Sequence, residues 1–432
     1  MAPHLQGETG ESMTAEKNGL AKVWSALGPG LITGAADDDP SGIATYSQAG
    51  AQFGYQLGWT MLLTLPFMAA IQVISACIGW DTRAGLARNI ADRLPVPVLF
   101  GIVALLAIAN TINIAADLAA MGESLKLIVG GPSIAYALGF GIVCLTAEIF
   151  VPYHRYVGYL KFLTLVLFVY VAAAFSVEVP WLEVLKSTLW PRLSLDRDMF
   201  LTIVAVFGTT ISPYLFFWQA SQEAEESNLS HRRQHAQARL SAGDFRHINR
   251  DTWAGMIVSN TIALFIIITT AATLHAHGVT NIQTASQAAE ALRPIAGVFT
   301  FVLFAAGIIG TGLLAVPVLA GSAAYAVAES FRLPGSLELP ANRALGFYAI
   351  VSAATLAGAG LTLTNLDPIA MLFWAAVING VVAVPIMAVM MIVVSPRAGR
   401  ETLALPSWLR VLGWLGTALM AVTVGAMVWT SA

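Results

Sequence analysis

The residue types best suited to chemistry stand together in the run 37–42, where three carboxylates precede a proline, a serine and a glycine. Apolar sequence flanks this run on both sides, from Val23 to Ala36 and from Ile43 to Gly54. A continuous helix would place ionised groups and a mid-helix proline deep in a bilayer, and both are costly. Neither cost arises if the helix is broken and the break faces a water-filled cavity. Carboxylates at such a break are typical of a cation site in a transporter.

A second interruption lies in the apolar stretch 199–222, where small and hydroxyl-bearing residues run from Gly208 to Ser212 directly before Pro213. Interrupted helices at corresponding positions in two halves of a chain are typical of inverted repeats, with the substrate between the breaks. The alternative is that Pro213 only kinks an ordinary helix.

The elements that position both breaks are predicted to be membrane helices. Of the 432 residues, 57% are hydrophobic and 11% are charged, whereas soluble domains are near 25% charged. The mean hydropathy is +0.72, which excludes a soluble class and makes the lipid bilayer the expected partner. The formal charge of −3 gives no indication of nucleic acid. Cys77 and Cys144 lie in apolar stretches, so neither a disulfide nor a cofactor is expected. We find no nucleophile–base pair in the sequence and expect no enzyme.

Apolar runs of about 20 residues, enough to cross the hydrocarbon core, predict an all-α integral membrane protein. We expect eleven transmembrane helices arranged as a 5+5 inverted repeat, with helices one and six broken. Residues 1–22 are expected to form a flexible cytoplasmic tail and 23–432 one transmembrane domain. Its parts are repeat one (23–177), repeat two (198–395) and an extra helix (406–432). The expected spans are 24–50, 56–80, 97–128, 132–152, 156–176, 199–222, 252–277, 296–329, 342–361, 368–394 and 407–430.

Lysines and arginines predict the orientation of these spans. With the N-terminus inside, the inner segments hold fifteen of them and the outer loops four. Positive residues gather in cytoplasmic loops, so the N-terminus is expected in the cytoplasm and the C-terminus outside a bacterial inner membrane. The outer loop 178–197, with two tryptophans, is expected at the membrane interface. The polar stretch 223–250 is expected to be a solvated cytoplasmic connector.

Several motifs resemble the Nramp family of divalent-metal transporters. They are Gly28-Pro29-Gly30, Asp39-Pro40, Ala44-Thr45 and the run 48–55 in the first span, with 114–119 in the third. The resemblance implies an eleven-helix fold of the amino-acid-transporter type with alternating access. In typical members it also implies proton-coupled uptake of manganese or ferrous iron.

The resemblance further implies where the metal ligands stand. Typical members use an Asp, an Asn, a Met and a backbone carbonyl, and these positions correspond here to Asp39, Gly42, Ser212 and Thr209. Two of the three side-chain ligands are therefore missing.

Two groups that typical members use for protons are also replaced. The His after the sixth-helix proline becomes Tyr214, and the Glu after the third-helix Asp becomes Ala120, whereas Asp117 itself remains. Proton coupling therefore stays open. Entry driven by the membrane potential is the alternative, because it gains about 2.3 kcal/mol per charge per 100 mV.

The altered site has oxygen as its only donor type. A thioether favours soft metals, whereas oxygen ligands suit hard ions, and magnesium keeps several of its waters. We therefore expect import of Mg²⁺ or Mn²⁺ rather than iron, with metal ligands Asp39, Ser212 and the Thr209 carbonyl. A magnesium-carrying branch of the family likewise lacks the Met. The wider expected binding set adds Asp37, Asp38, Ser41 and Gly42.

Other polar residues are expected nearby. Asp37 or Asp38 has the alternative role of capping the outgoing half-helix. Asp117 is the group expected to carry protons, with Asn110 and Asn113 as its partners. Asn379 and Gln219 are expected to line the cavity, and Tyr214 is expected to be a packing residue. Two alternatives remain open. The same fold could carry an organic cation or another small solute, with the Asp37–Asp39 carboxylates pairing with an amine, or it could act as a sensor without transport.

Overall fold

The computed structural model describes residues 29–151, 163–191, 194, 196–234, 240–364, 366–396 and 405–431, and all regular structure in them is helical. Eight helical stretches there are long and apolar enough to cross a membrane. A ninth is formed if Leu165–Ser176 and Trp181–Leu189, which meet at 115°, count as one. The predicted all-α membrane class is confirmed for these residues. The expected tail 1–22 lies outside them.

The α-helices are α2 (Pro29–Asp37), α3 (Pro40–Phe53), α4 (Gly58–Thr82), α5 (Leu86–Arg93), α6 (Val96–Val129), α7 (Ser133–Phe150), α9 (Phe168–Ser176), α10 (Trp181–Leu189), α11 (Arg197–Thr210), α12 (Pro213–Gln234), α13 (Ala242–Thr273), α14 (Ala285–Glu290), α15 (Arg293–Ala296), α16 (Thr300–Ser330), α17 (Leu345–Leu361), α18 (Pro368–Val394) and α19 (Ser407–Ser431). Short 3₁₀ turns, such as Gly54–Leu57 and Leu163–Leu167, connect several of them.

The span count differs from the expected eleven for identifiable reasons. The first two expected spans run together, because the turn Gly54–Leu57 joins α3 to α4 in one apolar stretch, Pro40–Thr82. The expected ninth span is α17, whose 17 residues are just short of a full crossing. The fifth expected span begins in 152–162, outside the described residues.

The expected connector 223–250 is mostly helix rather than loop. Helix α12 continues to Gln234 and α13 already begins at Ala242. A capping box between Ser241 and Asp244 starts α13, since each side chain bonds the other residue's backbone N–H. The polypeptide that links these two expected spans is therefore largely helical, and not the loop that its polar sequence suggests.

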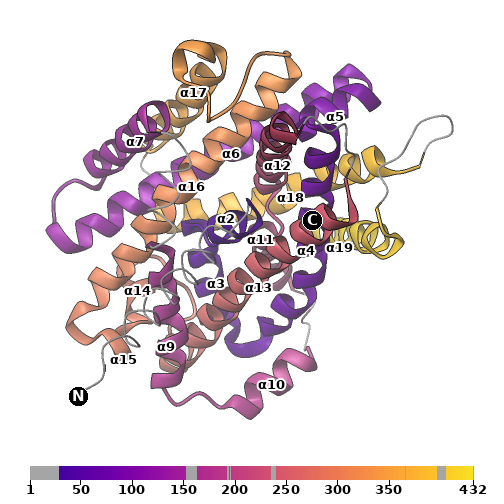
Figure 1. The fold of residues 1–432 in the computed structure, drawn as a ribbon. Coiled ribbons are helices and arrows are strands. Elements are labelled where there is room, and N and C mark those ends of the chain that lie inside the picture. Colours follow the sequence, from indigo (N-terminus) through magenta and orange to yellow (C-terminus); the bar gives the residue numbers. More distant parts are fainter. Residues whose placement is uncertain are drawn as a thin grey trace, which may run out of the picture.

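Both predicted interruptions are present. Helix α2 ends at Asp37 and α3 begins at Pro40, while α11 ends at Thr210 and α12 begins at Pro213. Each proline stands at the first position of the new helix, where its missing N–H costs nothing. Figure 1 shows α2 and α3 in the middle of the bundle, with α13, α16, α6 and α18 around them. The two breaks therefore lie inside the protein.

Close glycine contacts hold the broken helices against their neighbours. A Cβ on Gly208 of α11 would overlap the Ala376 carbonyl oxygen of α18, and one on Gly34 of α2 would overlap the backbone of Gly255 in α13. Only glycine allows backbones to approach this far, as is common where membrane helices pack.

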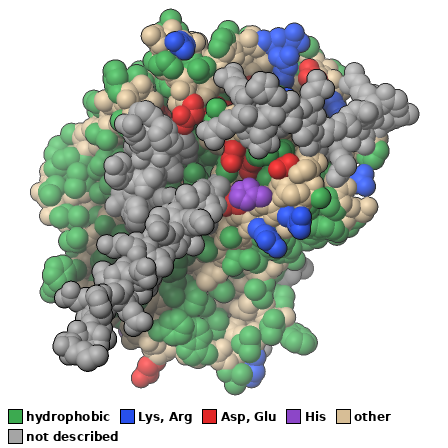
Figure 2. Space-filling view, in the orientation of Figure 1, with side chains coloured by type: hydrophobic (Ala, Val, Ile, Leu, Met, Phe, Trp, Pro, Cys, Tyr) green, Lys and Arg blue, Asp and Glu red, His purple; other side chains and the backbone are tan. Residues whose placement is uncertain are grey.

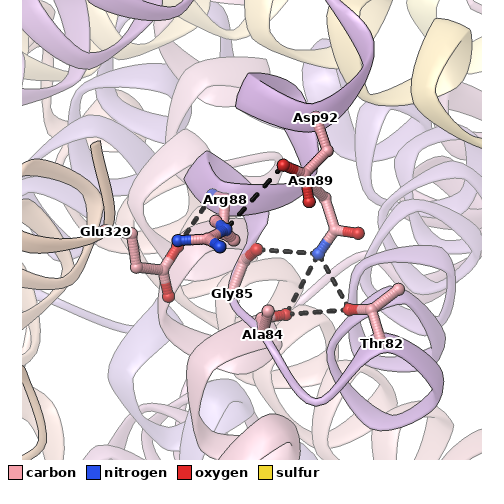
Figure 3. Close-up of polar contacts among 7 residues, drawn as sticks. All are labelled: Thr82, Ala84, Gly85, Arg88, Asn89, Asp92 and Glu329. Atoms are coloured by element: carbon pink, nitrogen blue, oxygen red, sulfur yellow. Dashed lines mark hydrogen bonds and ion pairs between the residues drawn. The ribbon is translucent and has the colours of Figure 1, made fainter. Parts of the chain in front are cut away.

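The turn between α4 and α5 is tied down by polar contacts (Figure 3). The Asn89 amide donates to the Ala84 and Gly85 carbonyls at 3.1 and 2.8 Å. At the start of α5, the Arg88 backbone N–H donates to the Glu329 carboxylate of α16 at 3.1 Å. A carboxylate suits the exposed N–H groups at a helix start, so Glu329 fixes α5 to the end of α16.

Much of the surface is apolar, as a lipid-facing protein requires (Figure 2). Where polar groups gather in this view, acidic side chains surround a histidine beside lysines or arginines. Glu226 of α12 lies close to both His247 and Asp251 of α13.

Candidate functional site

Asp39 occupies the first break as the N-cap of α3. Its Oδ1 accepts hydrogen bonds from the Ser41 hydroxyl and from the Gly42 backbone N–H, both at 2.7 Å. Aspartate is among the preferred residues at this position, because its side chain satisfies an N–H that lacks a helical partner. Only 2% of Asp39 is exposed. This side chain is thus held rigidly at the centre of the fold, with its second oxygen directed away from α3.

The second oxygen of Asp39 meets helix α6. The Asn113 amide Nδ2 donates to Asp39 Oδ2 at 3.0 Å and lies 3.5 Å from Asp117 Oδ2. The Asn113 carbonyl Oδ1 in turn accepts from the Asn379 amide of α18 at 3.4 Å. All four side chains are buried. A polar path therefore links the first break to α6 and α18 through Asn113.

The second break presents hydroxyls and carbonyls. The Ser212 hydroxyl lies 2.6 Å from the Thr209 carbonyl oxygen and 3.0 Å from that of Gly208. The Thr209 hydroxyl lies 3.0 Å from the Tyr46 hydroxyl of α3, which joins the two broken helices. The expected carbonyl ligand, Thr209, is thus engaged by the expected hydroxyl ligand, Ser212.

Asp37 and Asp38 do not cap α3, because Asp39 takes that position. The capping role considered for the two residues was therefore wrong. Both carboxylates contact one hydroxyl, that of Ser259 in α13, at 2.7 Å from Asp37 Oδ2 and 3.1 Å from Asp38 Oδ1. The pair therefore faces α13, whereas Asp39 faces α6.

The first half-helix, α2, is held by hydrogen bonds at both ends. At its start, the Gly30 backbone N–H donates to Asp251 Oδ2 of α13 at 2.7 Å. Near its end, the Tyr214 hydroxyl donates to the Ala36 carbonyl oxygen at 2.9 Å. Gln219, expected to line a cavity, is fully buried and its amide donates to the Thr252 hydroxyl at 2.9 Å. Helix α2 is thus bonded to α13 at its start and to α12 next to the break, and α12 is bonded to α13.

Several buried oxygens around the breaks lack hydrogen-bond donors. They are Asp37 Oδ1, Asp117 Oδ1, Asn379 Oδ1 and Gln219 Oε1. Each of these oxygens can accept a hydrogen bond but has no donor, and burying such an atom costs free energy. An acceptor-rich, donor-poor region attracts a cation.

On the other side of the break lies an open cavity of about 720 Å³. Its floor includes Ala44 of α3 and Thr202 of α11, and its rim includes Asp198 and Asp367. Ala44 is five residues beyond Asp39, which at a helical rise of 1.5 Å per residue is about 7.5 Å along the axis of α3. We call this cavity the vestibule.

The carboxylates do not form a ready metal cage by themselves. Within the described part of the chain, no three His, Cys, Asp or Glu side chains converge as a metal site. A cation at Asp39 would have to take its other ligands from the amides, hydroxyls and carbonyls near the breaks, and from water. Such an oxygen set suits a hard cation that keeps part of its hydration shell.

Sequence reasoning assigned no direct site role to Asn113, Tyr46 or Ser259. Asn113 was expected only as a partner of Asp117, although an amide in an apolar span was a visible signal. Tyr46 and Ser259 carried no signal, because their contacts cross 163 and 222 residues of sequence. Tertiary packing alone brings them to the site.

Comparison with known proteins identifies relatives of the whole chain. The Nramp family model, described as natural resistance-associated macrophage protein-like, matches residues 30–430. A divalent metal cation transporter MntH of Verminephrobacter eiseniae is 26% identical over 379 residues, covering 84% of this chain and 83% of that protein. One from Aeromonas hydrophila is 28% identical over 340 residues, covering 75% and 78%.

Solved structures show the same fold. The manganese transporter of Eremococcus coleocola aligns with a TM-score of 0.72 at 16% identity, over 98% of this chain and 88% of that one. A nucleobase-cation-symport-1 family transporter in a closed conformation aligns with a TM-score of 0.57 at 11% identity, over 94% and 92%.

Proposed function

Because the chain belongs to the Nramp family, and is therefore a membrane transporter rather than an enzyme, we propose that it imports a divalent cation across a bacterial inner membrane. The observation that carries this proposal is the buried Asp39 carboxylate at the first break, in a protein whose neighbouring helices hold further buried oxygens without donors, those of Asp37, Asp117 and Asn379. The relatives named as divalent metal cation transporters and the manganese transporter with a similar fold support the substrate class.

The proposed fold has eleven spans in a 5+5 inverted repeat. The broken pairs α2–α3 and α11–α12 are spans one and six, and the extra helix is α19. The matching interruptions, each ending in a helix that starts with proline, support this assignment. In the proposed orientation the tail 1–22 is cytoplasmic, the C-terminus lies outside and the vestibule opens outward.

The proposed ligands are Asp39, the Thr209 carbonyl, Ser212 and water. The Ser212 hydroxyl hydrogen must turn away from the Thr209 carbonyl to let a cation approach both oxygens, and rotation about the Cβ–Oγ bond does this without moving either oxygen. Since no sulfur ligand remains, Mg²⁺ or Mn²⁺ is preferred over softer ions. This preference is altered relative to typical Nramp proteins.

Alternating access is the proposed mechanism. The vestibule is lined by Ala44, five residues beyond Asp39 on α3, while α2 is held by Asp251 at its start and by Tyr214 near the break. This arrangement fits an outward-facing state, in which entry is open and exit is closed. Release of α2 from these two contacts would open the inner side. Either protons, through Asp117, or the membrane potential would supply the driving force.

Uptake into liposomes tests the proposal. The purified protein should accumulate Mg²⁺ or Mn²⁺, measured with and without a pH gradient. Asp39→Asn keeps the N-cap hydrogen bonds, since asparagine also caps well, but removes the charge. We expect Asp39→Asn to fold normally and to lose uptake. Undiminished uptake by this variant would show that the Asp39 charge does not hold the cation.

An organic cation is the second candidate substrate, favoured by the absence of a three-ligand His, Cys, Asp or Glu cluster among the described residues. The 720 Å³ vestibule is also large enough for a small amine. Thermal stabilisation by an amine, together with no heat from Mg²⁺ or Mn²⁺ in titration calorimetry, would favour this candidate.

A further inference from the structure

Helix α6 supplies a carboxamide to the site at the point where the first span lacks one. The resemblance to typical family members places an Asn three residues after the anchoring Asp, and this position is Gly42 here. In the structure, the Asn113 amide reaches the same carboxylate from another helix, at 3.0 Å from Asp39 Oδ2. The carboxamide is therefore present, but it comes from α6.

We propose that Asn113 is a specificity-determining residue, whose amide oxygen replaces the carboxamide ligand missing at position 42. This inference rests on the proposed cation transport, and it assigns to Asn113 a role that neither the family motif nor the sequence reasoning gave it.

In the structure the amide is turned the other way. Its Nδ2 faces Asp39 and Asp117, so its hydrogens carry positive partial charge toward the anchor. This orientation gives Asp39 Oδ2 a hydrogen-bond donor. A cation arriving at Asp39 repels these hydrogens and attracts the Oδ1 atom. Rotation about χ2, a broad two-fold torsion in asparagine, exchanges the two atoms.

The rotation also involves Asn379. The Asn113 Oδ1 atom accepts from the Asn379 amide nitrogen at 3.4 Å, so a turned Asn113 NH₂ group would meet another donor unless the Asn379 amide turns as well. Turned together, the Asn379 amide presents to Asn113 its Oδ1 atom, which is buried without a donor. The rotation gives up the 3.5 Å contact between Asn113 Nδ2 and Asp117 Oδ2, and binding of the cation must compensate for that loss.

A Cβ at position 42 would point to the same carboxylate. It would lie 3.5 Å from Asp39 Oδ1 and from the Asp37 carbonyl oxygen, and 3.3 Å from a Tyr46 ring carbon. A shift of the Tyr46 ring by a few tenths of an ångström would admit this Cβ beside the anchor. The two positions should be interchangeable, which permits a complementation experiment.

The experiment compares Asn113→Leu, Gly42→Asn and the double variant Gly42→Asn/Asn113→Leu. Leucine matches asparagine in shape but has no amide. Calorimetry gives the dissociation constant for Mn²⁺ and Mg²⁺, and liposome uptake gives KM and maximal rate. We expect Asn113→Leu to weaken cation binding at least tenfold, and the double variant to recover to within about threefold. Asn113→Ser, which is smaller and keeps one donor for Asp39, serves if the leucine variant does not fold.

Asn110→Leu is the matched control on the same helix. The Asn110 amide bonds the Leu319 carbonyl at 2.8 Å and the Ser322 hydroxyl at 2.7 Å, in contacts with α16. Its replacement should lower the melting temperature without a specific change in the dissociation constant.

Two outcomes overturn the inference: unchanged binding in Asn113→Leu, or a double variant as weak as the single one. Loss of uptake in Asp39→Asn together with either of these results leaves the proposed cation transport intact and removes only the role of Asn113. Retained uptake in Asp39→Asn would instead remove the transport mechanism itself.

Discussion

The Tyr214 hydroxyl donates to the Ala36 carbonyl oxygen at 2.9 Å, and this bond joins the two broken helices. Ala36 is the penultimate residue of α2, so its carbonyl has no partner within its own helix. Tyr214 of α12 supplies that partner in a fully buried position. Tyr214, at the position where the resemblance places a histidine, thus holds α2 against α12.

Tyr214→Phe should weaken the contact between α2 and α12. The buried Ala36 carbonyl would lose its donor, at a cost of about 1–3 kcal/mol, and α2 would open more often. A cysteine at Thr33, which is fully buried in α2, should then react faster with a thiol reagent applied from the cytoplasmic side. Tyr136→Phe is the control, because its hydroxyl bonds the Gly130 carbonyl at an exposed site. Equal labelling rates in both variants would contradict the proposal that Tyr214 holds α2 against α12.

Gly208→Ala should disrupt the contact between α11 and α18. The added methyl group would overlap the Ala376 carbonyl oxygen and the Gly380 backbone, and overpacking of this kind typically costs 1–3 kcal/mol. The melting temperature of the detergent-solubilised protein should fall. Gly101→Ala and Gly139→Ala are controls, since a Cβ at either position meets no atom within 4 Å. These two helical glycines should be neutral or slightly stabilised. Similar behaviour of all three variants would argue against close packing at Gly208.

The local features of the site could be predicted from the sequence, whereas its long-range partners could not. Pro40 and Pro213 mark helix starts because the missing N–H acts within one turn. The same logic identifies Asp39 as an N-cap, since it directly precedes a proline, yet Asp37 and Asp38 were considered for that role. The contact between Asn113 and Asp39 spans 74 residues, and it depends on how α6 packs beside the break. No residue spacing in the sequence predicts how α6 packs there.

Asp367→Asn should weaken cation capture at the vestibule. Asp367 is the N-cap of α18, with Oδ1 accepting from the Ala370 N–H at 2.9 Å, and asparagine preserves this cap. Only the negative charge at the rim is lost. We expect KM to rise about two- to fivefold at low ionic strength with an unchanged maximal rate, because rim charges attract cations over long distances. Glu183→Gln on α10, which does not line the vestibule, should change neither value. A KM insensitive to salt in the parent protein would contradict this steering.

Glu329→Ala should release α5 from α16. The carboxylate accepts the Arg88 backbone N–H, and it also lies against Gly85, where a Cβ would collide with it. Without it, the first N–H groups of α5 lose their partner, and hydrogen exchange over Leu86–Arg93 should accelerate. Glu338→Ala, on an exposed side chain, should leave exchange in α5 unchanged. Protection of α5 that survives in Glu329→Ala would show that apolar packing alone holds this helix.

Ser212→Met should change which cation the site prefers. A thioether at the second break adds a soft ligand beside the Thr209 carbonyl, and soft ligands favour Fe²⁺ or Cd²⁺ over Mg²⁺. It also removes the Ser212 hydroxyl that occupies the Thr209 carbonyl at 2.6 Å, so this oxygen becomes free to face the cation. In competition uptake, the ratio of Cd²⁺ to Mg²⁺ transport should rise about tenfold, which corresponds to about 1.4 kcal/mol. Ser212→Ala separates the two effects, since it frees the carbonyl without adding sulfur and should leave the ratio close to that of the parent. If Ser212→Met and Ser212→Ala select cations alike, the sulfur does not reach the transported ion, and position 212 is not a ligand position in this chain.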